Sequence, residues 1–344
     1  MNREAVGRTE RVPHGGESDP AVLDFSANVN PRTPPGVEAV YREALERSRR
    51  YPDDEYREYR EAAGAYVGCS PEEVIPTPGG LAAIRLAIET TVEAGDTVLV
   101  PYPSFGEYAR EVRLQGATPV FVRHDDILEC EPAGHALAVV CTPNNPTGEC
   151  APAAKLRRYA ARCREAGTTL LVDEAFLGFT DEPTLAGEDG VIVARSLTKL
   201  FGLPGLRAGF AVASGDQREA LERARPAWNL GTPAAMVGTH CLRQEAFVRE
   251  TRTTVARERA RLRGALERRF DVSPSDAPFL LCELTAADPL ADERAPVAAL
   301  CASAREAGVA LRDARTFRGL DSHVRVAVKD RAANGRLLEV LVGE

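Results

Sequence analysis

Side chains that could bind ligands or react follow three apolar stretches of the sequence. Asn145 lies in CTPNNPTG, Asp173 ends LLVD, and Ser196, Lys199 and Arg207 lie in ARSLTKLFGLPGLRAGF. A lysine amine in a partly desolvated site has a lowered pKa and can form an imine with a carbonyl compound. A carboxylate at the end of an apolar strand is costly to bury alone, so Asp173 should face a cation. Serine and arginine can bind a phosphate, the arginine with two parallel hydrogen bonds.

Each stretch also has an ordinary structural interpretation. Asn145 could belong to a structural Asn-Pro turn, Asp173 could pair with a buried arginine, and a Ser-x-x-Lys sequence alone is usually a solvated turn. The chain has only three lysines, Lys155, Lys199 and Lys329, so an imine-forming enzyme has few candidates. The chemistry therefore depends on whether the fold brings the three stretches together.

The pattern of apolar residues predicts a sheet that would position these side chains. Unbroken Val, Ile and Leu runs alternate with helical patterns, which is typical of a mostly parallel sheet covered on both faces. The predicted strands lie near residues 97–105, 118–122, 136–141, 169–173 and 191–196. Ligands of open α/β sheets bind beyond the carboxyl ends of the strands, and the three stretches fall there.

A change of pattern near residue 215 predicts a second, smaller unit. Long charged helices are expected over 216–225 and 243–268, then short strands near FLLCEL and VRVAV with a helix over 296–307 between them. We therefore expect an α/β fold with a large, mostly parallel domain and a smaller α+β domain. The predicted division is an N-terminal arm at 1–35, a large domain at 36–225 and a small domain at 226–344.

Composition argues against several classes of protein. A net charge of −8 argues against a nucleic-acid partner. No run of about 18 apolar residues is present, so no transmembrane helix is predicted. The polar N-terminus does not resemble a signal peptide, and we expect a cytoplasmic protein. The eight cysteines form no C-x-x-C pair, so we expect neither a metal site nor a disulfide framework.

The order of the three stretches resembles the series found in fold-type I enzymes that use pyridoxal 5′-phosphate (PLP), the class I/II aminotransferase-like family. The resemblance covers nearly the whole chain. It implies that Lys199 holds PLP as a Schiff base and that Asp173 pairs with the pyridinium nitrogen, keeping it protonated. It also implies that Asn145 contacts the phenolic oxygen, and that Ser196 and Arg207 bind the cofactor phosphate.

The same resemblance assigns further cofactor residues. The sequence PGG ahead of a helix implies phosphate-binding backbone N–H groups at Gly80 and Leu81. In PYPSFGEY, Phe105 would stack on the cofactor ring. In RYPD, Tyr51 would reach the cofactor phosphate of a partner subunit, which implies a homodimer with shared active sites.

Two subfamilies that act on phosphorylated amines or amino acids resemble the chain most. Four segments are more similar to L-threonine-O-3-phosphate decarboxylase of cobalamin biosynthesis than to histidinol-phosphate aminotransferase: HGG ahead of LDFSANVNP, VDEAFLGF, RSLTKLFGLPGLRAGF and LRDARTFRGLDSHVRVAV. Phe176 stands where many aminotransferases have a tyrosine that contacts the phenolic oxygen. We expect decarboxylation of L-threonine O-3-phosphate to (R)-1-aminopropan-2-ol O-phosphate. The alternative is a histidinol-phosphate or related aminotransferase that uses 2-oxoglutarate.

A substrate of this kind is small and carries a carboxylate and a phosphate. The resemblance assigns Arg312 and Arg325 as the pair that binds it, and it places Asn30 and Asn28 on a substrate-facing arm. His14 would meet the substrate phosphate, although a lone histidine in an arm could equally be inert.

The choice of reaction depends on which substrate bond stands perpendicular to the cofactor ring. If the carboxylate does, carbon dioxide leaves; if Cα–H does, Lys199 removes that proton and transamination follows. The way Arg312 and Arg325 hold the anions would decide this. Arg318 is a further arginine nearby, for which a surface role is expected. A non-catalytic regulatory protein of the same fold is a minor alternative, and the sequence contains no DNA-binding segment.

Overall fold

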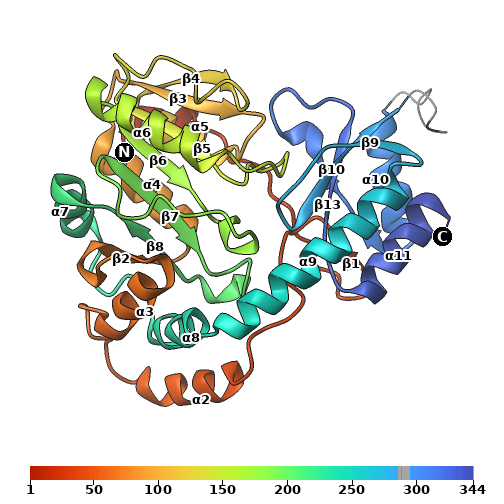
Figure 1. The fold of residues 1–344 in the computed structure, drawn as a ribbon, viewed down its shortest axis with the longest axis horizontal. Coiled ribbons are helices and arrows are strands. Elements are labelled where there is room, and N and C mark those ends of the chain that lie inside the picture. The colour runs from red at the N-terminus through yellow and green to blue at the C-terminus, as the bar shows by residue number, and fades with distance from the viewer. Residues whose placement is uncertain (286–287, 289–294, 344) are drawn as a thin grey trace.

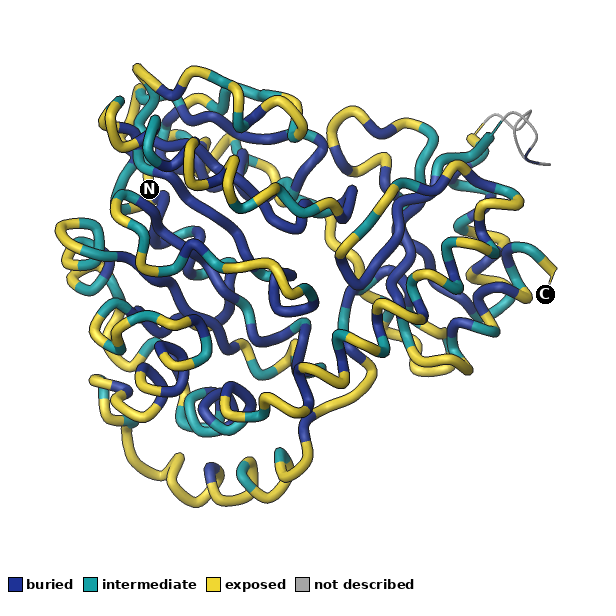
Figure 2. The backbone as a smooth tube through the Cα atoms, in the orientation of Figure 1, coloured by how far each residue is buried: buried dark blue, intermediate teal, exposed yellow. Residues whose placement is uncertain are grey.

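Two sheets of unequal size lie side by side, each with helices packed around it (Figure 1). The structure is a computed structural model and describes residues 1–285, 288 and 295–343. Most strands of both sheets are buried, β4 at the edge of the larger sheet being an exception, and the exposed backbone belongs mainly to helices and connecting loops (Figure 2). In the described part of the chain, no helix is long and apolar enough to cross a membrane.

The larger sheet has seven strands in the order β2-β8-β7-β6-β5-β3-β4. Only β8 runs antiparallel to its neighbours, so the sheet is mostly parallel, as the sequence predicts. Its strands are β2 (Val74–Thr77), β3 (Thr97–Tyr102), β4 (Thr118–Arg123), β5 (Leu137–Cys141), β6 (Thr169–Asp173), β7 (Val191–Ser196) and β8 (Gly209–Val212).

Both faces of this sheet are buried, which explains its unbroken apolar runs. Along β6, Leu170 and Val172 belong to one core cluster and Leu171 to the other, because successive side chains point to opposite faces. One cluster includes residues of α4 (Gly80–Thr91), α5 (Glu107–Leu114) and α7 (Gly215–Ala224). The other includes residues of α3 (Arg57–Val67), α6 (Ala153–Ala166) and α8 (Thr232–Leu242). Helix α2 (Val37–Arg47) packs on α8.

The smaller sheet is antiparallel, with strand order β12-β13-β10-β9. Its strands are β9 (Phe270–Val272), β10 (Phe279–Leu284), β12 (Arg312–Asp313) and β13 (His323–Ala327). The helices beside it are α9 (Glu245–Leu266), α10 (Pro296–Glu306) and α11 (Arg331–Val342). The described residues also form the short 3₁₀ helices η1 (Pro71–Glu73), η2 (Leu177–Phe179), η3 (Pro204–Leu206) and η4 (Ala314–Thr316).

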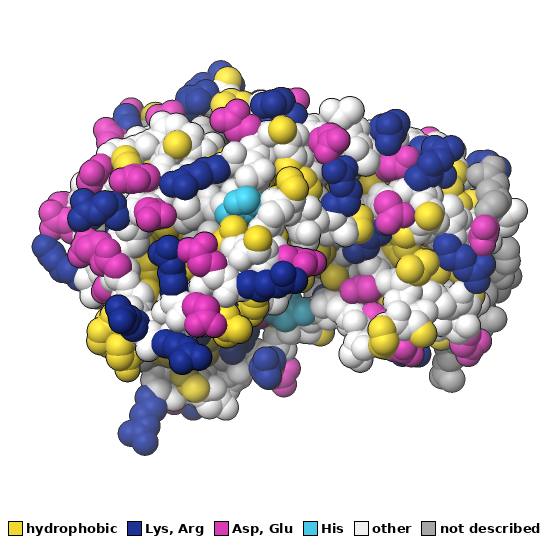
Figure 3. Space-filling model, turned by 90° about the horizontal axis from the view of Figure 1, so that it is seen from below, with side chains coloured by type: hydrophobic (Ala, Val, Ile, Leu, Met, Phe, Trp, Pro, Cys, Tyr) yellow, Lys and Arg dark blue, Asp and Glu magenta, His cyan; other side chains and the backbone are white. Residues whose placement is uncertain are grey.

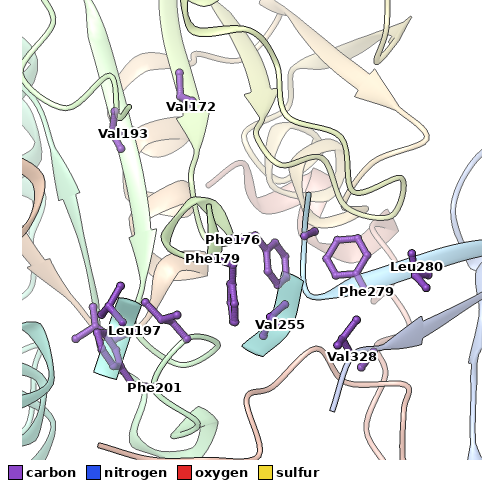
Figure 4. Packing of buried hydrophobic residues seen from close by; sticks show 14 of the residues in the cluster. Val172, Phe176, Phe179, Val193, Leu197, Phe201, Val255, Phe279, Leu280 and Val328 are labelled. Atoms are coloured by element: carbon purple, nitrogen blue, oxygen red, sulfur yellow. The ribbon is translucent and has the colours of Figure 1, made fainter. Parts of the chain in front are cut away.

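One apolar core joins the two sheets. The ring of Phe176, just before η2, packs edge-on against Phe279 of β10, with ring centroids 5.1 Å apart. Figure 4 shows these rings together, with Val255 of α9 close by and Phe179 on the same side. Since this cluster lies at the join between the sheets, it fixes how the smaller sheet faces the larger one.

The N-terminal arm is more ordered than the sequence indicates. It contains a short helix, α1 (Arg3–Arg8), that packs on α5, and the strand β1 (Leu23–Asp24), which pairs in parallel with β11 (Val309–Ala310). The arm therefore touches the larger body at one end and the smaller body at the other. The predicted division at residues 225 and 226 stays a prediction, and α8, which follows it, packs against α2 and α3.

Candidate active site

A cavity of about 310 Å³ lies where the ends of the large-sheet strands face the smaller sheet and the N-terminal arm. All predicted site residues line it except Tyr51 and Asn30. Those that do are His14, Gly80, Leu81, Phe105, Asn145, Asp173, Ser196, Lys199, Arg207, Arg312 and Arg325. Residues from three distant stretches and from both bodies thus meet at one place, where α/β folds bind ligands.

Lys199 follows β7 by three residues and reaches a largely desolvated part of the cavity. Burial, together with the neighbouring cations Arg325, Arg207 and Lys329, lowers the pKa of its amine to about 8. The carboxylate of Asp173 raises the pKa of the Lys199 amine and so partly offsets this effect. The neutral amine that imine formation requires is therefore accessible near neutral pH.

Asp173 is the last residue of β6, and its carboxylate is buried. Burial raises its pKa, while hydrogen bonds counteract this change. The hydroxyl of Tyr108 donates to Oδ2 at 2.6 Å, and the backbone N–H of Ala175 donates to Oδ1 at 2.9 Å. A buried carboxylate held in this way suits a cationic partner, such as a protonated ring nitrogen.

An anion cradle forms where α4 begins beside the end of β7. Gly79 precedes the helix with a φ of 97°, and a Cβ atom there would lie 2.4 Å from Nη2 of Arg207. A Cβ atom at Gly80 would lie 3.0 Å from Cβ of Ser196. The missing side chains let arginine, serine and the N–H groups of the helix start approach one another closely, and such a site favours a phosphate.

The smaller sheet supplies two arginines to the opposite wall. Arg325 of β13 donates to Oδ1 of Asn145 and, at 2.9 Å, to the carbonyl oxygen of Ser26. Arg312 of β12 donates to the carbonyl oxygen of Pro13 at 2.7 Å. Burial and, to a lesser extent, repulsion by Arg312 lower the pKa of Arg325 to about 9. Two cations held close together in a buried wall provide a strong site for an anionic substrate.

Two polar atoms in the cavity wall lack a hydrogen-bond partner and could bind a ligand. Within the described residues, Nε of Arg325 and Oδ1 of Asn28 are buried and have no hydrogen-bond partner. Buried polar atoms of this kind are rare in native proteins and call for a specific explanation. A bound polar ligand would provide one, since both residues line the cavity.

The structure corrects the expectation for Asn30. Its amide donates to the carbonyl oxygen of Leu200 at 2.8 Å and to the hydroxyl of Thr251 at 3.3 Å, and its Oδ1 accepts from the N–H of Arg32. These bonds hold the arm against the body of the protein and turn the side chain away from the cavity. Its neighbour Asn28, two residues earlier, lines the cavity instead.

Tyr51 lies outside the cavity. Its side chain is 79% exposed, and its ring stacks on that of Trp228 with centroids 4.6 Å apart. The expectation that it reaches a partner subunit stays a prediction. Arg318 lies over the ring of Phe121, 3.9 Å from the centroid, and is not among the cavity-lining residues.

Tyr108 and Glu107, both at the start of α5, were missed by sequence reasoning. Tyr108 holds Asp173, and Glu107 binds His14 at 2.8 Å. A signal was present, because Phe105, Tyr108, Ala109 and Val112 have the spacing of one helix face. Because no helix is predicted over residues 107–114, Phe105 is the only residue of PYPSFGEY to which the sequence assigns a role.

The residues present fit PLP. The cavity offers an amine, a buried carboxylate, an aromatic ring at Phe105 and a phosphate cradle, and its volume lies within the range of about 300–1,000 Å³ that is common for cofactor sites. Asn28 and Arg325 leave polar atoms for a substrate beside it.

The sequence profile of the family Aminotransferase class I and II matches residues 20–341. The chain belongs to this family, as the order of its motifs indicates. PLP is its cofactor, which confirms the expectation from the sequence.

Relatives with two different activities are similar to the chain. Histidinol-phosphate aminotransferase 2 of Archaeoglobus fulgidus is 32% identical over 94% of this chain and 93% of its own length. Threonine-phosphate decarboxylase of Salmonella typhimurium is 30% identical over 95% of this chain and 92% of its own length. The relatives of this chain therefore include proteins named for two different activities.

Solved structures of both kinds share the fold. The histidinol-phosphate aminotransferase from Clostridium acetobutylicum has a TM-score of 0.84 and 25% identity, over 94% of this chain and 98% of that one. The L-threonine-O-3-phosphate decarboxylase from Porphyromonas gingivalis has a TM-score of 0.83 and 24% identity, over 93% of this chain and 98% of that one. The fold is therefore that of fold-type I PLP enzymes.

Proposed function

We propose that the protein decarboxylates L-threonine O-3-phosphate, with PLP as cofactor, and releases (R)-1-aminopropan-2-ol O-phosphate. The observation that carries the proposal is the convergence of His14, Arg312 and Arg325 with Lys199 in one small cavity. A substrate with a carboxylate and a phosphate at its two ends matches the two arginines and an imidazole that can donate a hydrogen bond. The cavity volume of about 310 Å³ suits a small substrate beside the cofactor.

The same geometry supports the cofactor roles that we propose. Bound PLP supplies an electron sink for the bond that breaks. Lys199 would hold it covalently until the substrate amine takes the place of the lysine amine, which is then released as a free amine. Asp173, kept in place by Tyr108, would stabilise positive charge at the ring nitrogen. Ser196 and Arg207 would hold the phosphate at the start of α4, and Phe105 would cover the ring.

The substrate roles divide between two regions. Arg325 is fixed by Asn145 and by the rings of Phe279 and Phe317, whose centroids lie 5.1 and 5.7 Å from its Cζ. A side chain held so firmly suits the substrate carboxylate, since the orientation of that group selects the bond that breaks. Arg312 and His14 are then available for the phosphate.

Histidinol-phosphate aminotransferase activity is the second candidate. The relative from Archaeoglobus fulgidus supports it, and so does Lys199, whose pKa of about 8 would allow the amine to remove a proton from Cα and return it elsewhere. Both candidates require a phosphate site and an arginine pair. They differ in the need for a 2-oxo acid as second substrate.

One pair of assays tests the proposal. Carbon dioxide release from L-threonine O-3-phosphate without any 2-oxoglutarate is expected of the decarboxylase. Glutamate formation from histidinol phosphate and 2-oxoglutarate, with no carbon dioxide in the first assay, would establish the aminotransferase instead. Lys199→Ala should abolish either activity and the visible absorption of bound PLP. The matched control is Lys155→Ala, because Lys155 is an exposed lysine beside Glu129.

A further inference from the structure

Residues 9–16, here called the strap, form part of the cavity wall. The strap starts at the end of α1, and its residues Val12, Pro13, His14 and Gly15 line the cavity. Helix α1 is fixed to the larger body, because the N–H of Asn2 donates to the carbonyl oxygen of Leu114 at 2.7 Å. The strap therefore spans the space between a fixed helix and the cavity.

The strap packs closely against neighbouring backbone at two glycines. A Cβ atom at Gly106 would lie 2.9 Å from Cγ1 of Val12, and one at Gly15 would lie 2.4 Å from the carbonyl oxygen of Ser26. Arg312 donates to the carbonyl oxygen of Pro13. The strap thus touches both bodies of the protein and one of the two arginines proposed to bind substrate.

Glu107, the first residue of α5, binds the strap from the larger body. Its side chain is 6% exposed, whereas that of His14 is 48% exposed. Nε2 of His14 lies 2.8 Å from one oxygen of Glu107, and Arg110 lies 3.4 Å from the other. Arg110 makes its shorter contact, 2.8 Å, with Glu111. A buried carboxylate needs a close partner, and here the strap supplies it.

His14 also lies beside the proposed cofactor face. Its ring centroid is 5.7 Å from that of Phe105, which is 5.6 Å from that of Tyr108, the residue that holds Asp173. Glu107 therefore fixes a potential cation next to the ring that would cover PLP.

We propose that Glu107 is a positioning residue: it holds His14 in the cavity wall and thereby sets the preference of the enzyme for a phosphorylated over a non-phosphorylated amine. This inference rests on the proposed function, because it assigns His14 to the substrate phosphate. Glu107 itself need not touch the substrate. Its effect is to prevent the exposed imidazole from turning into solvent.

The test compares two amines that lack a carboxylate, O-phosphoethanolamine and ethanolamine. Their equilibrium binding to the PLP-loaded protein is followed by the change in visible absorption, and the ratio of the two Kd values measures the preference for phosphate. Glu107→Gln keeps the size of the side chain and removes its charge, so the preference should fall about 10-fold, while ethanolamine binding stays the same. Adding His14→Ala to Glu107→Gln should reduce the preference no further than His14→Ala alone.

Glu222→Gln is the control, since Glu222 of the larger body is bound by Arg60 and Arg225 and not by the strap or by Arg110. A second measurement, on the protein without cofactor, is tryptic cleavage after Arg11, which should be faster in Glu107→Gln than in Glu222→Gln. A wild-type protein that does not prefer the phosphorylated amine would overturn both the proposed function and this inference. A wild-type preference that Glu107→Gln retains would overturn the inference alone.

Discussion

Lys199 is a buried amine whose protonation differs between the folded and the unfolded chain. Burial lowers its pKa from 10.5 to about 8 in the folded protein. Between these values the unfolded chain binds the proton and the folded protein does not, so the free energy of unfolding rises with pH across this window. Below pH 8 the folded protein holds a buried cation and has lost this stability.

We therefore expect Lys199→Met to stabilise the cofactor-free protein at pH 7, by on the order of 3 kcal/mol. The difference should shrink as the pH rises from 8 to 10.5, because the wild-type amine is then neutral. Thermal unfolding of both proteins over this pH range measures it. Lys155→Met serves as the control for an exposed lysine, and parallel curves for wild type and Lys199→Met would contradict the expectation.

Tyr108 provides a second test at a single residue. Its hydrogen bond lowers the pKa of Asp173 against the effect of burial. Tyr108→Phe should therefore raise that pKa and weaken PLP binding, by about 10-fold if the hydrogen bond to the carboxylate is of ordinary strength. Titration of the cofactor-free protein with PLP measures this. Tyr56→Phe, which loses a hydrogen bond to the carbonyl oxygen of Leu230, should change stability but not PLP affinity.

Most of the site could be predicted from side chains that follow apolar runs. Asp173 and Lys199 stand at strand ends, where the chain pattern alone locates them. Asn30 could not be separated from Asn28, because both lie in the irregular stretch SANVN, and only the fold shows which side chain turns toward Leu200. Tyr108 was missed because its role depends on a residue far away in the sequence.

Alanine substitutions at the start of α4 can test whether the close approach of backbone and Arg207 forms the phosphate cradle. Gly79 and Gly95 have nearly equal φ angles, 97° and 96°, but a Cβ atom would meet Arg207 only at Gly79, and nothing lies within 4 Å at Gly95. Alanine at either position should lower stability by about 1–3 kcal/mol through backbone strain. Only Gly79→Ala should also weaken PLP binding. We expect its Kd for PLP to rise at least 10-fold, because the added methyl group would displace Arg207 from the phosphate cradle.

Unfolding and PLP titration of the two alanine variants separate these effects. An equal loss of PLP affinity in Gly79→Ala and Gly95→Ala would show that backbone strain, and not the contact with Arg207, controls cofactor binding.

Strands were easier to predict than helices near the site. β5, β6 and β7 each contain an unbroken apolar run of at least three residues, since both faces of the sheet are covered. The short strands β2 and β8 lack such runs, and their pairing is non-local, so the pattern did not indicate them. Helix α5 carries several charges, and its apolar face is short.

The side of the molecule that carries α2 bears exposed apolar side chains. Leu45 is 64% exposed, Tyr41 49%, Tyr51 79% and Trp228 51%. Figure 3 views the molecule from that side and shows hydrophobic side chains interspersed with charged ones. Exposed apolar clusters on a folded protein commonly mark an interface, and a second copy of the chain is the partner that the sequence implies.

We expect the protein to sediment as a homodimer, and Leu45→Glu to shift it toward the monomer. Val6→Glu is the control, because Val6 is 48% exposed on α1 and lies outside this cluster. In the dimer, Tyr51→Phe should weaken PLP binding if Tyr51 reaches the cofactor phosphate of the partner. A wild-type monomer at high concentration would contradict the expectation.

The pairing of β1 with β11 has a consequence for the order in which the protein is made. Leu23 and Asp24 are synthesised long before their partners Val309 and Ala310, because the two strands lie far apart in the sequence. The arm segment that carries Asn28 therefore lacks its strand partner until translation has reached β11. The arm can take its place in the cavity wall only after its partner strand has been made, so a chain released from translation before Val309 cannot form this pairing.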